Sequence, residues 1–191
     1  MSLLEDNFSE LVHRVEAGRE FVDASFEPIF YLVFDPGDIL EVKRKTPGWQ
    51  ARLENSGWNV HTFSIAKQVT DILEMAPQRK FWLAGDRKAP LEWRRTNGAL
   101  ANALTAQGQL QVRLEALLSS LEGKTNTIVL VTDLEALHPY LRIGAIESQL
   151  QGKFHVPTVF LYPGTRMGKT QLRFLGFYPE DGNYRSVHVG G

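Results

Sequence analysis

Short continuous apolar runs, separated by longer helix-patterned segments, constrain the fold of this chain more than any other feature. The runs IFYLVF at residues 29–34 and TIVLVT at residues 127–132 have the length and the β-branched and aromatic content of strands buried on both faces. Residues 157–161 form a third run, and residues 172–177 a fourth. Because connections long enough to hold helices place successive strands parallel, the sequence predicts an α/β fold. We expect a three-layer sandwich with a mainly parallel sheet, Rossmann-like or degenerate P-loop-like.

Start and stop signals indicate where the first helices lie. Apolar residues recur at helical spacing from Leu4 to Val15, and Gly18 follows, which predicts an opening amphipathic helix. Thr46 and Pro47 fit an N-cap followed by proline in the first turn, so they predict that the next helix begins there.

Similar start and stop signals predict the strand and the helices in the middle of the chain. A short strand is expected at residues 59–63, followed by a helix that Ser64 caps and Pro77 stops. Leucines at alternating four- and three-residue steps predict one long helix from about residue 99 to residue 121, with the leucine stripe in the core. His138-Pro139 is interpreted as the start of a further helix.

Composition limits the class of protein. A chain of 191 residues with 43% hydrophobic and 23% charged residues is typical of one globular domain, so residues 1–191 are expected to form a single domain. The net charge of -1 provides no general attraction to nucleic acid or to an anionic membrane, and such binding would need a local patch. The sequence contains no cysteine, which excludes disulfides and thiolate zinc sites. The amino terminus lacks a signal-peptide pattern, and no segment approaches the roughly 20 apolar residues of a membrane span, so a cytoplasmic location is expected.

Residues 163–170, PGTRMGKT, match the phosphate-binding pattern G-x-x-x-x-G-K-[ST] except at the first glycine. In such a loop, backbone N–H groups hold phosphate at the start of a helix, while the lysine contacts the phosphates and the hydroxyl contacts magnesium. The residues after Thr170, QLRFLGF, have a strand pattern instead. We therefore expect a glycine turn between two strands, with Lys169 exposed. A small NTPase that uses Gly168, Lys169 and Thr170 with Asp133 is the alternative.

Three aspartates could mark a second site. Asp35 and Asp133 each follow a predicted buried strand, and Asp38 comes close behind the first. Since the carboxyl ends of parallel strands meet at the edge where ligands usually bind, a magnesium or nucleotide site is conceivable. Aspartate also commonly forms turns and caps at such positions, and this is the interpretation we favour. The five histidines show no metal-binding spacing, so we predict no catalytic, cofactor-binding or metal-binding residues.

Residues 78–97 are neither cleanly periodic nor plainly a linker. The segment contains two tryptophans and six basic residues, which are Trp82, Trp93, Arg79, Lys80, Arg87, Lys88, Arg94 and Arg95. Tryptophan and arginine are enriched at protein-binding hot spots, and basic residues interleaved with aromatic ones also bind nucleic acid. Three interpretations stay open: a solvated loop whose aromatic residues close over the sheet, a protein-binding segment, and a nucleic-acid-binding module.

The last third of the chain holds three motifs in succession, Tyr-Pro-Gly at residues 162–164, Leu-Arg-Phe-Leu-Gly at residues 172–176 and Asn-Tyr-Arg at residues 183–185. Through these motifs the chain resembles the BrxB family of BREX bacteriophage-exclusion systems. Members of that family end in a strand, a Y-P-G-x-Y-x-G turn, an L-x-L-F-G strand and an N-Y-Y-R stretch. The matching residues here are 162–164 with Gly168, 172–176 and 183–185. Upstream, three further segments are also similar to the family, namely Asp35-Pro36, the run TIVLVTD and His-Pro-Tyr-Leu-Arg at residues 138–142. Arg166 stands in place of the second turn tyrosine, and one tyrosine of the final pair is missing, which indicates a divergent member.

This resemblance implies a small component of an antiphage defence island that is not an enzyme. It would work beside a large PglZ-like protein of the alkaline-phosphatase family, an ATPase and usually a DNA methyltransferase. Association with the PglZ-like protein and other BREX components is the expected role. The residues expected to bind partners are Tyr184, Arg185, Arg142, Trp82, Trp93, Arg94 and Arg95.

Overall fold

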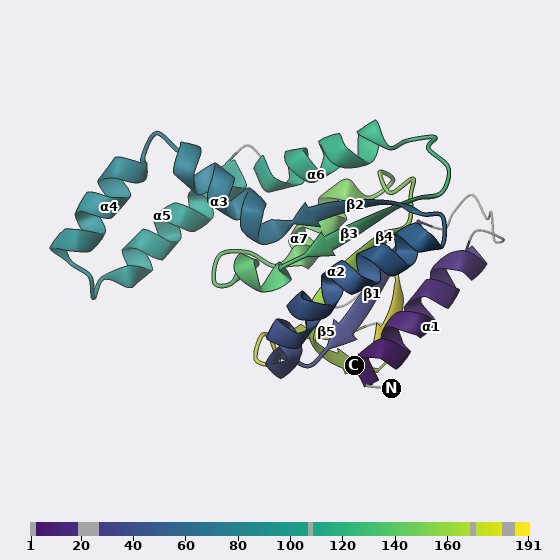
Figure 1. Ribbon diagram of the computed structural model, residues 1–191. Helices are drawn as coiled ribbons and strands as arrows, with labels where there is room; N and C mark the ends of the chain where they lie inside the picture. Colours follow the sequence, from purple (N-terminus) through teal and green to yellow (C-terminus); the bar gives the residue numbers. More distant parts are fainter. Residues whose placement is uncertain (1–2, 19–26, 107–108, 169–170, 181–185) are drawn as a thin grey trace.

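A six-stranded sheet forms the centre of the molecule, as described by the computed structural model for residues 3–18, 27–106, 109–168, 171–180 and 186–191 (Figure 1). The strands lie in the order β2-β3-β4-β1-β6, and β5 pairs with β4 outside this path. Their bounds are β1 (Ile29–Phe34), β2 (Asn59–Ser64), β3 (Thr127–Thr132), β4 (Thr158–Met167), β5 (Gln171–Phe174) and β6 (Val187–Gly190). Pairing is parallel along the whole path, and only β5 is antiparallel to its neighbour.

Helices cover both faces of this sheet (Figure 1). The α-helices are α1 (Leu3–Gly18), α2 (Ile39–Asn55), α3 (Ile65–Met75), α4 (Arg79–Lys88), α5 (Trp93–Thr105), α6 (Gln109–Ser120) and α7 (Ile143–Glu147). Short 3-10 helices are η1 (Pro36–Asp38), η3 (Leu134–Leu137) and η4 (Ser148–Leu150). Side chains of α1 and α2 pack on one face, and those of α3, α6 and α7 pack on the other. The expected three-layer α/β sandwich is confirmed.

Strand β1 shows why the apolar runs become central strands. All six of its residues are buried, and alternate side chains enter opposite cores, with Tyr31 on the α3 side and Leu32 on the α1 side. Its whole length pairs with β4, from Ile29 opposite Thr158 to Phe34 opposite Pro163. A strand that is apolar at every position is stable only where helices cover both of its faces.

The order of the strands explains why the helices lie on both faces. The chain crosses from β1 to the far edge at β2, and then steps back through β3 to β4 beside β1. Because parallel crossovers are almost always right-handed, steps in opposite directions place their helices on opposite faces. Helix α2 makes the first crossing, while α3 to α6 and then α7 belong to the return.

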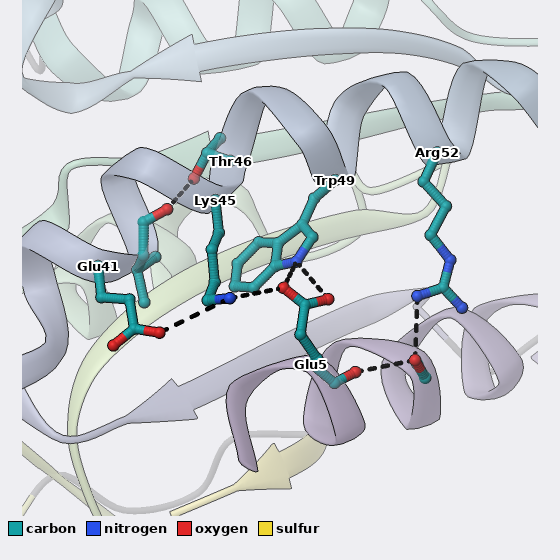
Figure 2. A network of polar contacts seen from close by, with 8 residues as sticks. Glu5, Glu41, Lys45, Thr46, Trp49 and Arg52 are labelled. Carbon is teal, nitrogen blue, oxygen red and sulfur yellow. Dashed lines mark hydrogen bonds and ion pairs between the residues drawn. The ribbon is translucent and has the colours of Figure 1, made fainter. Parts of the chain in front are cut away.

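One polar cluster joins α1 to α2 (Figure 2). The carboxylate of Glu5 accepts a hydrogen bond from the ammonium group of Lys45 at 2.9 Å and from the indole N–H of Trp49 at 3.2 Å. Beside it, the rings of Phe8 and Trp49 stack with centroids 4.5 Å apart. The hydrogen bond from Lys45, followed by that from Trp49, holds the pKa of Glu5 below its usual value, although burial acts in the opposite direction. The two helices therefore cover their face of the sheet as a pair.

The predicted start of a helix at Thr46 is wrong, because α2 begins at Ile39 and continues through Pro47. The ring of a proline inside a helix removes one backbone hydrogen bond. The bond that Pro47 cannot make is the one to the carbonyl of Lys43. The neighbouring hydroxyl of Thr46 donates a separate hydrogen bond of 2.8 Å to the carbonyl of Val42 (Figure 2). Val42 and Trp49 are buried on either side of the proline, so packing against the sheet keeps both halves helical.

The predicted single helix over residues 99–121 is also wrong, because α5 ends at Thr105 and α6 begins at Gln109. The leucine stripe nevertheless lies in the core, because the side chains of Leu110 and Leu114 on α6 are buried there. The chain divides here because α5 packs against α4 and α3, away from the sheet, whereas α6 lies over the sheet (Figure 1). One straight helix could not occupy both positions.

Two further differences from the predictions concern the second half of the chain. The helix expected to begin at His138-Pro139 begins at Ile143 instead. Directly after β3 the chain forms the short helix η3, whose leucines enter the core, and α7 follows only after it. Strand β6 was not predicted, because a strand of only four residues that ends in Gly190 carries little periodic signal. It forms because β1 would otherwise present an unpaired edge. By contrast, the expected strand at residues 59–63 and the cap by Ser64 are confirmed.

A glycine pair tests the packing of the β4–β5 hairpin. A Cβ at Gly164 would overlap the carbonyl oxygen of Arg173 and the ring of Tyr162, whereas a Cβ at Gly48 in α2 would meet no atom within 4 Å. We expect Gly164→Ala to lower the free energy of unfolding by about 1–3 kcal/mol. The matched Gly48→Ala should leave it unchanged or raise it by up to about 1 kcal/mol. Urea unfolding followed by circular dichroism measures both, and equal stabilities of the two variants would contradict the tight hairpin.

Candidate functional site

A cleft lies at the carboxyl ends of β1 and β3, beside Leu161 of β4 and between α2 and η3. It has a volume of about 260 Å³. Apolar side chains of Phe34, Val42 and Leu161 line one part, and Lys43 and Asp133 contribute charge. Because the connections after β1 and β3 leave toward opposite faces, this cleft lies at a topological switch point, where ligands of open α/β sheets usually bind.

One lysine in the cleft is shared between two carboxylates. The ammonium group of Lys43 lies 2.8 Å from one carboxylate oxygen of Asp133 and 2.6 Å from Glu135. The other oxygen of Asp133 accepts hydrogen bonds from the hydroxyls of Ser64 at 2.6 Å and Thr132 at 2.9 Å. Burial would raise the pKa of Asp133, but the hydrogen bonds from Lys43, Ser64 and Thr132 prevail and hold it below its usual value. Asp133 therefore remains ionised while it is paired with Lys43.

The three aspartates singled out in the sequence have different roles, and Asp38 lies directly before α2 with its backbone N–H bonded to the carbonyl of Asp35 in the turn. Asp35 forms the expected turn, with its carboxylate accepting a hydrogen bond of 2.7 Å from the backbone N–H of Gly37. Asp133 has a left-handed backbone, with φ of 61°, and joins the ends of β2 and β3 through Ser64 instead of capping a helix. Among the residues that the structure describes, no group of three or more His, Cys, Asp or Glu side chains could hold a metal ion.

The Walker-like string lies in a β-hairpin. Its first residues belong to β4, which continues to Met167, and Gly168 has a φ of 68° in the turn. Lys169 and Thr170 lie outside the described residues. The chain then forms β5, which is antiparallel to β4 with Thr165 opposite Arg173. The predicted hairpin is thus confirmed, because a strand follows where a phosphate-binding loop would start a helix.

The basic and aromatic segment forms a helical hairpin, α4–α5, which projects from one end of the sandwich (Figure 1). Every residue of α4 is exposed or half-buried. Four of the predicted partner-binding residues belong to this hairpin: Trp82 is half-buried in the first half of α4, and Trp93, Arg94 and Arg95 start α5 at the other end of the hairpin. Trp93 is 55% exposed, and the guanidinium of Arg94 lies 5.4 Å from the centre of its ring. Neither α4 nor the first half of α5 was predicted, and the projection of the hairpin was not predicted either.

The remaining predicted residues are elsewhere. Arg142 is exposed immediately before α7, near the phenol of Tyr178. Tyr178 also lies 2.5 Å from the imidazole of His138, and its ring stacks on Phe177, which is 65% exposed. Burial raises the pKa of Tyr178, while the charge of Arg142 acts against this rise. Tyr184 and Arg185 lie outside the described residues, so their predicted role stays untested.

This aromatic cluster and Lys43 were missed by sequence reasoning. His138 belongs to one motif of the resemblance, Tyr178 lies outside all of its motifs, and only the fold places the two side chains in contact. Lys43 lies 90 positions before Asp133, in a helix whose start was predicted incorrectly. Nothing in the local sequence distinguishes this lysine from other exposed ones.

Comparison with known families now identifies the class of protein. A sequence model of the family described as BREX protein BrxB matches residues 64–189, more than half of the chain. The chain therefore belongs to the BrxB family, as the resemblance of its motifs predicted, and is a component of a BREX phage-defence system. Comparisons with curated proteins and with solved structures gave no match. Within the described part of the chain, no helix has the length and apolar character needed to cross a membrane.

The charge of Asp133 is tested by Asp133→Asn, because asparagine also tolerates a left-handed backbone. We expect a loss of about 1–2 kcal/mol in unfolding free energy at pH 7, since the ion pair with Lys43 is lost. A carboxyl group with a lowered folded-state pKa stabilises the fold above its unfolded-state pKa of about 3.9, and this stability disappears as the pH falls through the folded-state value. Urea unfolding at several pH values should therefore show the two proteins converging in acid. A constant difference would contradict the ion pair.

The hairpin geometry of residues 163–174 generates a second prediction, on nucleotide binding. Addition of ATP with magnesium should leave the melting temperature of the protein unchanged, because no helix follows the glycine turn to hold the phosphates. Lys169→Ala serves as the control. An increase in melting temperature that Lys169→Ala removes would instead support the NTPase alternative.

Proposed function

We propose that this chain is an interaction and regulatory subunit of its BREX system, without a catalytic role of its own, and that it associates with the PglZ-like alkaline-phosphatase-family protein. We also propose that the protein is cytoplasmic and that residues 1–191 act as one domain. The observation that carries it is the projecting hairpin α4–α5, in which aromatic and basic side chains are held away from the core.

Exposure of large apolar side chains supports binding through this hairpin. Leu91 is 90% exposed, Phe81 65% and Trp93 55%. Aromatic and other large apolar side chains are enriched at protein interfaces, where a partner can bury them. Tryptophan and arginine dominate the energy of such interfaces, so Trp93 with Arg94 and Arg95 is the first candidate anchor, and Trp82 supports it.

Two features of the sheet support a role that is not catalytic. The acidic residue at the end of β3, Asp133, is paired with Lys43, and the Walker-like string turns one strand into the next. Arg142, whose charge acts on Tyr178, offers a second contact surface, together with the exposed ring of Phe177 that stacks on Tyr178. Tyr184 and Arg185 remain proposed partner residues.

Nucleic-acid binding is the second candidate function, because residues 79–95 contain six basic side chains and two acidic ones. Contacts with phosphates would make the affinity fall steeply with salt. We rank this candidate lower because Leu91 and Phe81 offer apolar surface that phosphates cannot use.

The test is co-purification with the PglZ-like protein of the same system. We expect the wild-type chain to form a stable complex at micromolar concentration, and Trp93→Ala combined with Arg94→Glu to weaken it by about tenfold or more. Leu40→Ala combined with Arg44→Glu, at exposed positions of α2, is the matched control and should bind normally. Two well-folded wild-type proteins that do not associate would contradict the proposed function.

A further inference from the structure

We infer that the hairpin α4–α5 recognises an acidic protein surface with an apolar pocket, which receives Leu91 and Trp93 at the hairpin tip. This inference rests on the proposed function and adds the chemistry of the partner surface. It also assigns a binding role to the outward face of α4, whose basic residues were not among the predicted partner residues.

The outward face of α4 is basic along its length. At 100° per residue, Arg79, Lys80 and Arg87 point within about 100° of one another, on the side of the helix opposite Trp82 and Gly85. Trp82 is the half-buried residue of α4, and the three basic residues are exposed, as are the other residues of the helix, Gly85 included. The basic side chains therefore face outward while α4 contacts α5.

The tip of the hairpin combines an apolar anchor with more positive charge. Leu91, which is 90% exposed, lies in the short turn between the helices, and Trp93 starts α5. Residues 91–95 line an open hollow of about 490 Å³. Arg94 and Arg95 come directly after Trp93 in the sequence and add positive charge beside these apolar side chains. An apolar centre with a charged rim is the arrangement typical of specific protein interfaces.

The charge of the hairpin determines which surface it fits. Six basic and two acidic residues lie between positions 79 and 95, whereas the whole chain has a net charge of -1, so the rest of the molecule is acidic. A complementary partner surface must then be acidic, because opposite charges speed association and exclude wrong partners. Leu83, Leu91 and Phe81 are exposed among these charges, and they favour a protein, which can bury them, over nucleic acid.

The experiment measures binding of the full chain to the PglZ-like protein at about 50 mM and about 500 mM salt. Arg79→Glu with Lys80→Glu places acidic residues in the first turn of α4, where the helix dipole tolerates them. We expect this variant to bind about tenfold or more weakly at low salt, with a smaller deficit at high salt. Leu91→Ser should weaken binding by about tenfold at both salt concentrations, because the apolar contact is not screened.

Matched controls separate these effects from general changes. Arg44→Glu with Lys124→Glu changes the net charge equally at exposed positions elsewhere, and Met75→Ser removes a side chain that is 76% exposed at the base of the hairpin. Both controls should bind within about twofold of wild type. Unchanged circular dichroism and melting temperature show that each variant is folded.

The other outcomes of the binding experiment would contradict either the inference alone or the proposed function as well. Failure of the wild type to bind would overturn the proposed function, and this inference with it. Normal binding by the α4 variant or by Leu91→Ser would overturn the inference and leave the proposed function standing. Self-association that Arg79→Glu with Lys80→Glu abolishes would identify a second copy as the occupant. Binding to single-stranded DNA that the same variant loses, with unchanged affinity for the protein, would identify nucleic acid. Either result would overturn the inference.

Discussion

The parallel pairing of β1 with β4 is the constraint on which the rest of this structure depends. Both strands are apolar and central, and their register aligns six consecutive residue pairs. Two adjacent parallel strands cannot be joined by a tight turn, so the chain between them must cross over the sheet. Those crossings supply the helices that cover both faces, and they place the carboxyl ends of the strands, with their loops, along one edge.

This arrangement separates two kinds of surface. At the edge of the sheet, Lys43 neutralises Asp133 within a cleft that the surrounding strands hold in place. The hairpin α4–α5 belongs instead to the long return from β2 to β3, where only α3 and α6 need to cover the sheet. The additional length of that connection is free to project, because the strands are already paired and covered without it. The hairpin therefore projects without disturbing the core of the sheet.

The accuracy of the sequence-based predictions varied with the range of the interactions involved. β1 and β3 were predicted from their own residues, because a run that is apolar at every position has few alternatives to a buried strand. The path of α2 through Pro47 was not predicted, because the local cost of a proline inside a helix is offset by burial of Val42 and Trp49 against strands that lie far away in the sequence. For the candidate site, the sequence drew attention to Trp93, Arg94 and Arg95 but did not show that they start a projecting helix.

By itself, the sequence determined the α/β class, the central strands, the turn at Gly168 and the concentration of basic and aromatic residues between positions 78 and 97. These properties depend on residue type and short-range spacing, which can be read along the chain. The tertiary structure decided where the leucine-rich segment divides, that β6 pairs with β1, that Lys43 meets Asp133 and that His138 meets Tyr178. Each of these depends on contacts between residues far apart in the chain, and their free energy exists only once the sheet has brought the segments together.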